Sequence, residues 1–239
     1  MEGVVWKCEV IDSILERGAE GCQFLNERGI GRAFFLRESI CYEKETTADI
    51  IMRVIAGTQK GRRLLFSVES HIRPTSGRVK EALFSILGTR MIGASLLDLF
   101  AGTGAVGLEA LSRGARQVVF VEQRAPSLRL LRENIKRCGS PPEATVIARD
   151  VWHFLRLPQG NSGTPFDILF ADPPYQSGNI EELLSLVSQH GTLAPDGVLI
   201  VEHPSSAGLP SQVGRLLRFR EAQYGDSALT FFDHAQPTR

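Results

Sequence analysis

The chain has 239 residues, of which 43% are hydrophobic and 23% are charged, an ordinary composition for a globular protein in water. No apolar stretch approaches the roughly 18–20 residues that cross a bilayer. The N-terminus also lacks the basic start and apolar run of a signal peptide, so we expect a cytoplasmic protein without a membrane span. Four cysteines without a CxxC pair or a Cys/His cluster argue against a disulfide scaffold and a metal site.

Acidic and basic side chains balance at 27 each, and this neutrality alone argues against a nucleic-acid partner. The balance is an average over unlike parts, because the net charge is −4 over residues 1–51, +6 over residues 52–90 and −2 over residues 91–239. A positive field confined to one segment attracts a polyanion. The alternative is a solvated basic surface with no partner.

The N-terminal residues 1–51 have weak periodicity and no recognisable motif. Their pattern predicts at most two short helices, around residues 10–17 and 23–27. Met52 opens a segment of different composition. Either translation starts at Met52 or residues 1–51 form a real appendage, and we treat them as an extension of open status.

The basic segment, residues 52–90, predicts a hairpin followed by a helix. Its strands are expected at residues 53–57 and 62–66, joined by a turn that contains Gly61. Ser76 is a suitable N-cap for a helix whose apolar residues recur at helical spacing until Gly88.

Beyond residue 90, strands and helices alternate. Strands are predicted at residues 95–100, 117–122, 144–148, 166–171 and 197–202, and the closing residues 215–222 and 229–233 predict a hairpin. The central strands are almost wholly apolar, which is typical of parallel strands covered on both faces. The pattern therefore predicts an α/β doubly wound sheet, mostly parallel with a C-terminal antiparallel hairpin, over residues 91–239.

A glycine-rich turn follows the first of these strands, where Gly102, Gly104 and Gly107 fit a GxGxxG pattern. Glycines permit a tight turn and close approach of a ligand. Glu122 ends the next strand, where a carboxylate accepts hydrogen bonds from ribose hydroxyls, so a dinucleotide site is formally possible. The alternative is a purely structural turn between strand and helix.

Asp98, four residues before the first glycine, favours a different ligand. A carboxylate there repels a pyrophosphate and suits a cation, such as the amino or sulfonium group of S-adenosylmethionine. Asp150 ends the third strand and is placed to accept from an adenine amino group. Both lie where open α/β sheets bind ligands. The alternative for each residue taken singly is an exposed loop acid with no ligand, which is the commoner case.

The segment Asp172–Tyr175 reads Asp-Pro-Pro-Tyr at the end of the fourth strand. The two prolines stiffen the backbone, so that Asp172 Oδ and the Pro173 carbonyl can accept both hydrogens of an exocyclic amine. Tyr175 is suited to stack on the attached base. Methyl transfer to that amine is an in-line displacement in which most of the catalysis is positioning. A rigid surface turn is the alternative.

With these motifs the chain resembles the class I S-adenosylmethionine-dependent methyltransferases that methylate amines. The stretches that begin Arg53-Val-Ile-Ala-Gly-Thr and Arg73-Pro-Thr-Ser-Gly-Arg-Val-Lys are similar to the bacterial RsmD-type family, the 16S ribosomal RNA (guanine-966-N2) methyltransferases. The resemblance extends from Met52 to about Asp233. No part of the family pattern corresponds to residues 1–51.

The resemblance implies S-adenosylmethionine as donor and 16S rRNA as substrate, within an assembled or assembling small ribosomal subunit, for an enzyme expected to be a monomer. It implies catalytic roles for Asp172, Pro173, Pro174 and Tyr175. It implies cofactor contacts from Asp98, Phe100, Gly102, Gly104, Gly107, Glu122, Gln123, Asp150 and Val151. It implies RNA contacts from Arg53, Lys60, Arg62, Arg63, Arg73, Thr75, Arg78 and Lys80.

Three rival functions remain open at this point. Adenine N6 in nucleic acid, or a protein glutamine amide, offers the same kind of amine to the tetrapeptide. A non-catalytic RNA-binding or assembly protein would retain the fold without the reaction, but the intact site residues argue against decay. A nicotinamide-dependent oxidoreductase would leave Asp98 and the tetrapeptide unexplained.

Overall fold

The computed structural model describes residues 22–26, 29–36, 39–42, 52–66, 77–157, 164–174 and 180–235. The chain forms two compact units, Met1–Ile50 and Ile51–Arg239. In the first unit, β1 (Cys22–Asn26), β2 (Gly29–Leu36) and β3 (Ser39–Tyr42) form an antiparallel sheet in that order.

The helix predicted over residues 23–27 is wrong, because residues 22–26 form β1. Cys22 lies opposite Ala33 and Asn26 opposite Gly29, so the two strands pair along the whole of β1. Pairing with the aromatic-rich β2 overrides a weak local helical pattern. The other predicted helix, over residues 10–17, lies outside the described residues.

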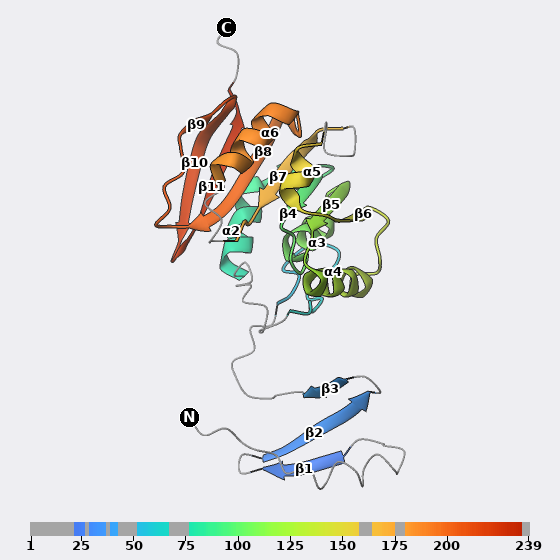
Figure 1. Ribbon diagram of the computed structural model, residues 1–239. Helices are drawn as coiled ribbons and strands as arrows, with labels where there is room; N and C mark the ends of the chain where they lie inside the picture. Colours follow the sequence, from blue (N-terminus) through green and yellow to red (C-terminus); the bar gives the residue numbers. More distant parts are fainter. Residues whose placement is uncertain are drawn as a thin grey trace. The chain divides into compact units, whose positions relative to one another are not determined.

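The second unit is built on an eight-stranded sheet with the order β6-β5-β4-β7-β8-β11-β10-β9. Its parallel strands are β4 (Ser95–Leu99), β5 (Gln117–Glu122), β6 (Ala144–Ala148), β7 (Phe166–Ala171) and β8 (Leu193–Pro204). The antiparallel strands are β9 (Gln212–Val213), β10 (Leu216–Tyr224) and β11 (Ser227–His234). The predicted fold class, including the closing hairpin, is confirmed (Figure 1).

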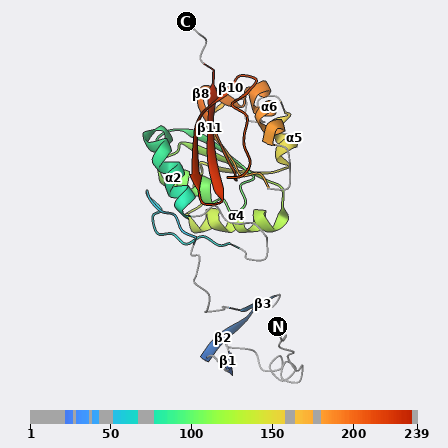
Figure 2. The ribbon, with the colours of Figure 1, turned by 90° about the vertical axis from the view of Figure 1, so that its left-hand side faces the viewer.

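Helices cover both faces of this sheet (Figure 2). The helices are α2 (Gly77–Leu87), the short 3-10 helix η3 (Gly88–Met91), α3 (Ala105–Ser112), α4 (Ala125–Arg137), α5 (Val151–Leu155) and α6 (Ile180–His190). Successive residues of a strand point to opposite faces. Accordingly Phe170 packs in the core beneath α2, α3 and α4, whereas Leu169 packs in the core beneath α5 and α6.

The basic segment packs against the same unit. Its predicted hairpin is present in reduced form, as a single antiparallel bridge between Arg53 and Arg63. Met52, Val54 and Leu64 are buried in the core that contains α2. The segment is therefore a layer on helices α2, α3 and α4, and packing fixes its position on this unit.

Buried polar side chains on α3 fasten this layer. The Glu109 carboxylate is fully buried and accepts from the backbone N–H groups of Ile55 at 2.7 Å and Ala56 at 3.0 Å. Ser112 Oγ accepts from the backbone N–H of Gln59 at 2.9 Å and donates to the Ala56 carbonyl. These contacts satisfy backbone groups of a segment that has almost no sheet pairing of its own. Among the described residues, no helix is long and apolar enough to cross a membrane.

Candidate active site

The sheet order brings the two predicted motifs together. β4 and β7 are neighbours, with Asp98 opposite Phe170 and Leu99 opposite Ala171. The glycine turn that follows β4 and the Asp-Pro-Pro segment that follows β7 therefore leave the sheet side by side, at the carboxyl ends of the strands (Figure 1). Open α/β sheets bind their ligands at this edge.

The glycine turn is tightly constrained. Phe100, Gly102 and Gly104 have φ angles of 58°, 55° and 78°. A left-handed backbone at Phe100, which is not glycine, costs about 1–3 kcal/mol of conformational strain, and such strain is found mainly at functional sites. A Cβ added at Gly104 would lie 2.4 Å from Leu131 Cδ1. The turn thus needs glycine both for its backbone angles and for its packing against α4.

Gly107 is required for packing alone, since a Cβ there would lie 2.2 Å from Phe120 Cε1 and 2.8 Å from Val118 Cγ1. Its absent side chain lets α3 lie directly on β5. The third glycine of the motif therefore sets how closely the helix approaches the sheet, and with it the direction in which the first turn of α3 faces the site.

Asp98 lies beneath the turn and is only 2% exposed. Its Oδ2 accepts from the backbone N–H of Gly107 at 3.0 Å. Burial raises the pKa of this carboxyl to about 8, with the Gly107 hydrogen bond lowering it and the Glu122 charge raising it. The sequence places Asp98 against a cofactor cation, whereas the structure directs it to the backbone of α3, so its first task is to hold the glycine turn.

Glu122, at the end of β5, is also turned toward the backbone. Its carboxylate accepts from the N–H groups of Gly102 at 2.9 Å, Gln123 at 2.8 Å and Arg124 at 2.7 Å. An ionised carboxylate has about four acceptor positions, so three bonds leave room for one ribose hydroxyl. The expected ribose contact fits this geometry, with Gly102 oriented by the same group.

An aromatic wall lies near the third strand, and of its two rings the predicted cofactor contacts include Phe100 but not Trp152. Phe100 and Trp152 meet edge to face with ring centroids 5.8 Å apart. Asp150 Oδ1 accepts from the backbone N–H of His153 at 2.8 Å and caps α5, and Val151 is buried beside it. Two rings, a cap carboxylate and the Glu122 acceptor fit the adenosine part of a cofactor.

The Asp-Pro-Pro segment follows β7, which lies between β4 and β8 in the sheet. Asp172 is half-buried, Pro173 is buried and Pro174 is exposed, while Tyr175 lies outside the described residues. The pKa of Asp172 is raised well above its usual range by burial, then by the charge of Glu202 and then by that of Asp98. Glu202 ends the apolar part of β8 and has no motif around it, so sequence reasoning gave no signal for it.

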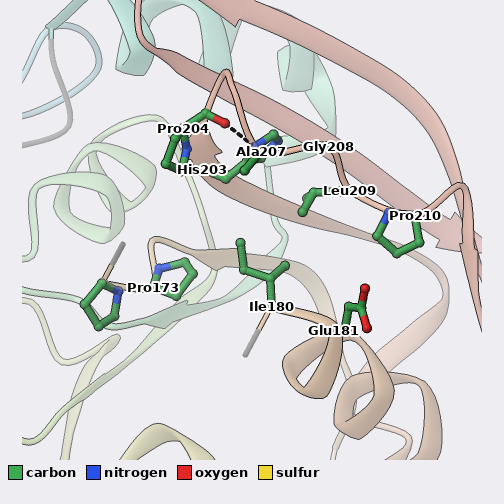
Figure 3. Close-up of a pocket in the computed structure, with 10 residues that line it drawn as sticks. Pro173, Ile180, Glu181, His203, Pro204, Ala207, Gly208, Leu209 and Pro210 are labelled. Carbon is green, nitrogen blue, oxygen red and sulfur yellow. Dashed lines mark hydrogen bonds between the residues drawn. The ribbon is translucent and has the colours of Figure 1, made fainter. Parts of the chain in front are cut away.

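A cavity of about 230 Å³ borders the two prolines (Figure 3). Pro173 and Ile180 line it on one side, and the segment from His203 to Pro210 lines it on the other. The His203 ring is 1% exposed, with Nδ1 2.9 Å from the Pro204 carbonyl and Nε2 2.7 Å from Thr230 Oγ1. Because a carbonyl only accepts, Nδ1 donates to the Pro204 carbonyl, and the Thr230 hydroxyl is the partner of Nε2.

The expected RNA contacts divide into three groups. The side chains of Arg53, Lys60, Arg62, Arg63 and Arg78 are exposed. Arg73 and Thr75 lie outside the described residues.

Lys80 corrects the prediction, because it is only 2% exposed and is not available to a phosphate. Its Nζ donates to the Arg53 carbonyl at 3.0 Å and lies 3.8 Å from Glu109 Oε2. Burial lowers the pKa of Lys80, and the nearby Glu109 carboxylate raises it. The lysine therefore stabilises the folded basic segment and does not contact RNA phosphates.

A glycine turn over a buried aspartate and an Asp-Pro-Pro segment, side by side on a sheet with this strand order, define a class I methyltransferase. In the described part of the chain, no group of three His, Cys, Asp or Glu side chains is arranged to hold a metal ion.

The family described as Conserved hypothetical protein 95 matches residues 52–233, and the chain belongs to this family of RsmD-type methyltransferases. It is 36% identical over 183 residues to the Ribosomal RNA small subunit methyltransferase D of Escherichia coli (strain K12), covering 76% of this chain and 89% of that protein. Identity to the protein of the same name from Haemophilus influenzae is 37% over 153 residues, covering 63% and 78%. The solved structure of a hypothetical protein from Thermus thermophilus has a TM-score of 0.66 at 32% identity, covering 77% of this chain and 99% of that one.

Proposed function

We propose that this protein transfers a methyl group from S-adenosylmethionine to the exocyclic N2 of a guanine in the RNA of the small ribosomal subunit. The observation that carries the proposal is the pairing of β4 with β7, which places the glycine turn beside Asp172. The names of the relatives from Escherichia coli and Haemophilus influenzae support a small-subunit rRNA substrate.

The chain's own residues supply binding and orientation. The fit of the cofactor rests on the aromatic pair Phe100 and Trp152 and on the acceptor position left on Glu122. When bound, S-adenosylmethionine supplies an electrophilic methyl group on a sulfonium. The turn at Gly102 and Gly104 brings the backbone close to that ligand without side chains in the way.

The target base has to leave its stack to reach this edge of the sheet, at a cost of a few kcal/mol. Asp172 Oδ and the Pro173 carbonyl then accept the two hydrogens of the amine, which withdraws the nitrogen lone pair from the ring and directs it at the methyl carbon. Tyr175 is proposed to stack on the base. Because the prolines have little freedom, most of the rate enhancement comes from positioning.

The exposed arginines and Lys60 of the basic segment are proposed to contact phosphates. Such contacts position an RNA without reading its sequence. They lie in the same compact unit as Asp172, so the register between the RNA backbone and the reacting base is set within one folded body. This favours nucleic acid over a protein amide as the substrate.

Transfer of tritium from labelled S-adenosylmethionine tests the proposal. Naked rRNA, isolated small subunits and intact ribosomes that lack the modification are the acceptors, and the labelled nucleoside is then identified. N2-methylguanosine is expected from at least one acceptor. Labelled N6-methyladenosine or labelled protein would overturn the proposal.

The variant Asp172→Ala separates catalysis from binding in the same assay. Asp172 is proposed to accept an amine hydrogen, whereas the glycine turn is held by Asp98 and Glu122, so transfer should be abolished while S-adenosylhomocysteine affinity is retained. The matched control is Glu143→Gln, which removes an exposed carboxylate remote from this edge. Near-normal turnover of Asp172→Ala would remove this residue from the mechanism.

A further inference from the structure

A second carboxyl group lies beside Asp172 on the neighbouring strand. β7 and β8 pair in parallel, with Phe170 opposite Ile200 and Ala171 opposite Val201. The next residues along the two strands are Asp172 and Glu202, and alternate residues of a strand share a face. Since Phe170 and Ile200 both pack in the core beneath α2 and α3, the two carboxyl groups continue that face at the carboxyl ends of the strands.

Among the described residues, the neighbours of this pair on the adjacent strands are apolar or acidic. Glu202 is only 3% exposed, and its neighbour on the other side, in β11, is Leu229. On the far side of Asp172, β4 contributes the buried Asp98. The facing helices carry Lys80 on α2 and Glu109 on α3. These two side chains form an ion pair, and each also makes a hydrogen bond to the backbone of the basic segment.

Two neighbouring carboxyl groups in such a place do not both ionise readily. Burial raises the pKa of Asp172, and Glu202 is the largest contribution from another charge, ahead of Asp98. A protonated Asp172 alone would donate a hydrogen bond where the mechanism needs an acceptor. A partner that holds the proton removes this conflict, because Asp172 can then remain a hydrogen-bond acceptor.

We propose that Glu202 shares one proton with Asp172, and that this carboxyl pair takes up the proton released when the guanine amine is methylated. The inference rests on the proposed function. Glu202 is a positioning residue in this scheme, because it orients and tunes Asp172 without touching the base.

The step balances in atoms and charge. The N2 lone pair forms the new N–C bond as the C–S bond breaks, and the sulfonium becomes a neutral thioether. An N2–H bond then breaks with its electrons left on N2, and the proton passes to an oxygen of the singly charged pair. One cation and one anion are thereby consumed, and the pair later returns the proton to water.

The pH dependence of single-turnover methyl transfer tests this role, measured from roughly pH 5 to 9. In Glu202→Gln the partner that shares the proton is absent, so Asp172 titrates alone and the acid limb of the rate profile should move to higher pH by about one unit. The rate at the optimum should drop by at least about 10-fold, with S-adenosylhomocysteine affinity changed less than twofold. Glu143→Gln, an exposed carboxylate, should leave the profile unmoved.

A purely structural role for Glu202 would lower stability and rate without moving the acid limb, and a superimposable profile overturns the inference. Carbon-13 carboxyl NMR of the unmodified protein provides a readout that needs neither turnover nor a folded variant. Asp172 and Glu202 should titrate together in two steps, and independent single titrations would reject the shared proton. If the pair titrates together but N2 of guanine is never labelled, the proposed function fails and the pair stands.

Discussion

Asn134 of α4 pairs with the backbone of Leu65 as another strand would. Its Oδ1 accepts from the Leu65 N–H at 2.7 Å, and its Nδ2 donates to the Leu65 carbonyl at 3.0 Å. The same Nδ2 donates to the Thr103 carbonyl in the glycine turn at 2.9 Å. One fully buried amide thus fastens both the basic segment and the cofactor turn to α4.

Replacement of this amide should therefore weaken two segments at once. Asn134→Ala leaves the Leu65 N–H and two carbonyls without their partner in a buried place, so the free energy of unfolding should fall by about 2–4 kcal/mol. Urea unfolding measures the change, and calorimetry should show weaker S-adenosylhomocysteine binding. The exposed amide of Gln189, which bonds Ser185 Oγ on its own helix, is the control, and Gln189→Ala should cost less than about 0.5 kcal/mol. A loss in Asn134→Ala no larger than that would contradict the structural assignment.

The buried Lys80 should behave unlike its exposed neighbours. Charge reversal at Arg63 or Arg78 should weaken RNA binding and flatten its salt dependence by about one unit of slope, because a phosphate contact is lost. Lys80→Met should keep that slope and instead lower stability by about 1–3 kcal/mol, since the Arg53 carbonyl loses its donor. Filter binding at several salt concentrations, with urea unfolding, distinguishes the two. An altered salt slope in Lys80→Met would return this lysine to the RNA surface.

The sequence predicts this fold well because each signal is local. Apolar strands and helical spacing are read directly from residues 91–239. The glycine turn and Asp172–Tyr175 are each an uninterrupted stretch of sequence. The failures are all long-range. Lys80 looks like any other basic residue until Glu109 and the Arg53 carbonyl surround it, and Glu202 acquires meaning only through the register between β7 and β8. The first unit shows the same limit, because pairing with β2 decides the conformation of residues 22–26.

Stability should fall as the pH rises, because Asp98 has a raised pKa. The folded carboxyl holds its proton up to about pH 8, whereas the unfolded one loses it near its ordinary value of 3.8. Its contribution is thus full below about pH 4 and is lost progressively up to about pH 8. Asp98→Asn does not titrate, and its amide oxygen can still accept from Gly107. The variant should be the more stable one at pH 8, by an amount on the order of a few kcal/mol, as measured by urea unfolding across this pH range. Parallel curves for the two proteins would place the proton elsewhere.

Gly107 provides the sharpest steric test of the cofactor turn. A methyl group there would lie 2.2 Å from Phe120 Cε1, within the fully buried core between α3 and β5, and neither side can retreat without moving the other. Gly107→Ala should therefore lower the free energy of unfolding by about 1–3 kcal/mol and shift the first turn of α3. The loss of binding free energy for S-adenosylhomocysteine should be larger than this loss of stability at the same temperature. Gly77→Ala is the matched control, because a Cβ at Gly77 meets nothing within 4 Å and the residue begins a helix. It should be neutral or stabilising by up to about 1 kcal/mol. Thermal unfolding and calorimetry on both variants decide the matter. If Gly107→Ala bound S-adenosylhomocysteine with normal affinity, the close approach of α3 to the sheet would have no part in shaping the site.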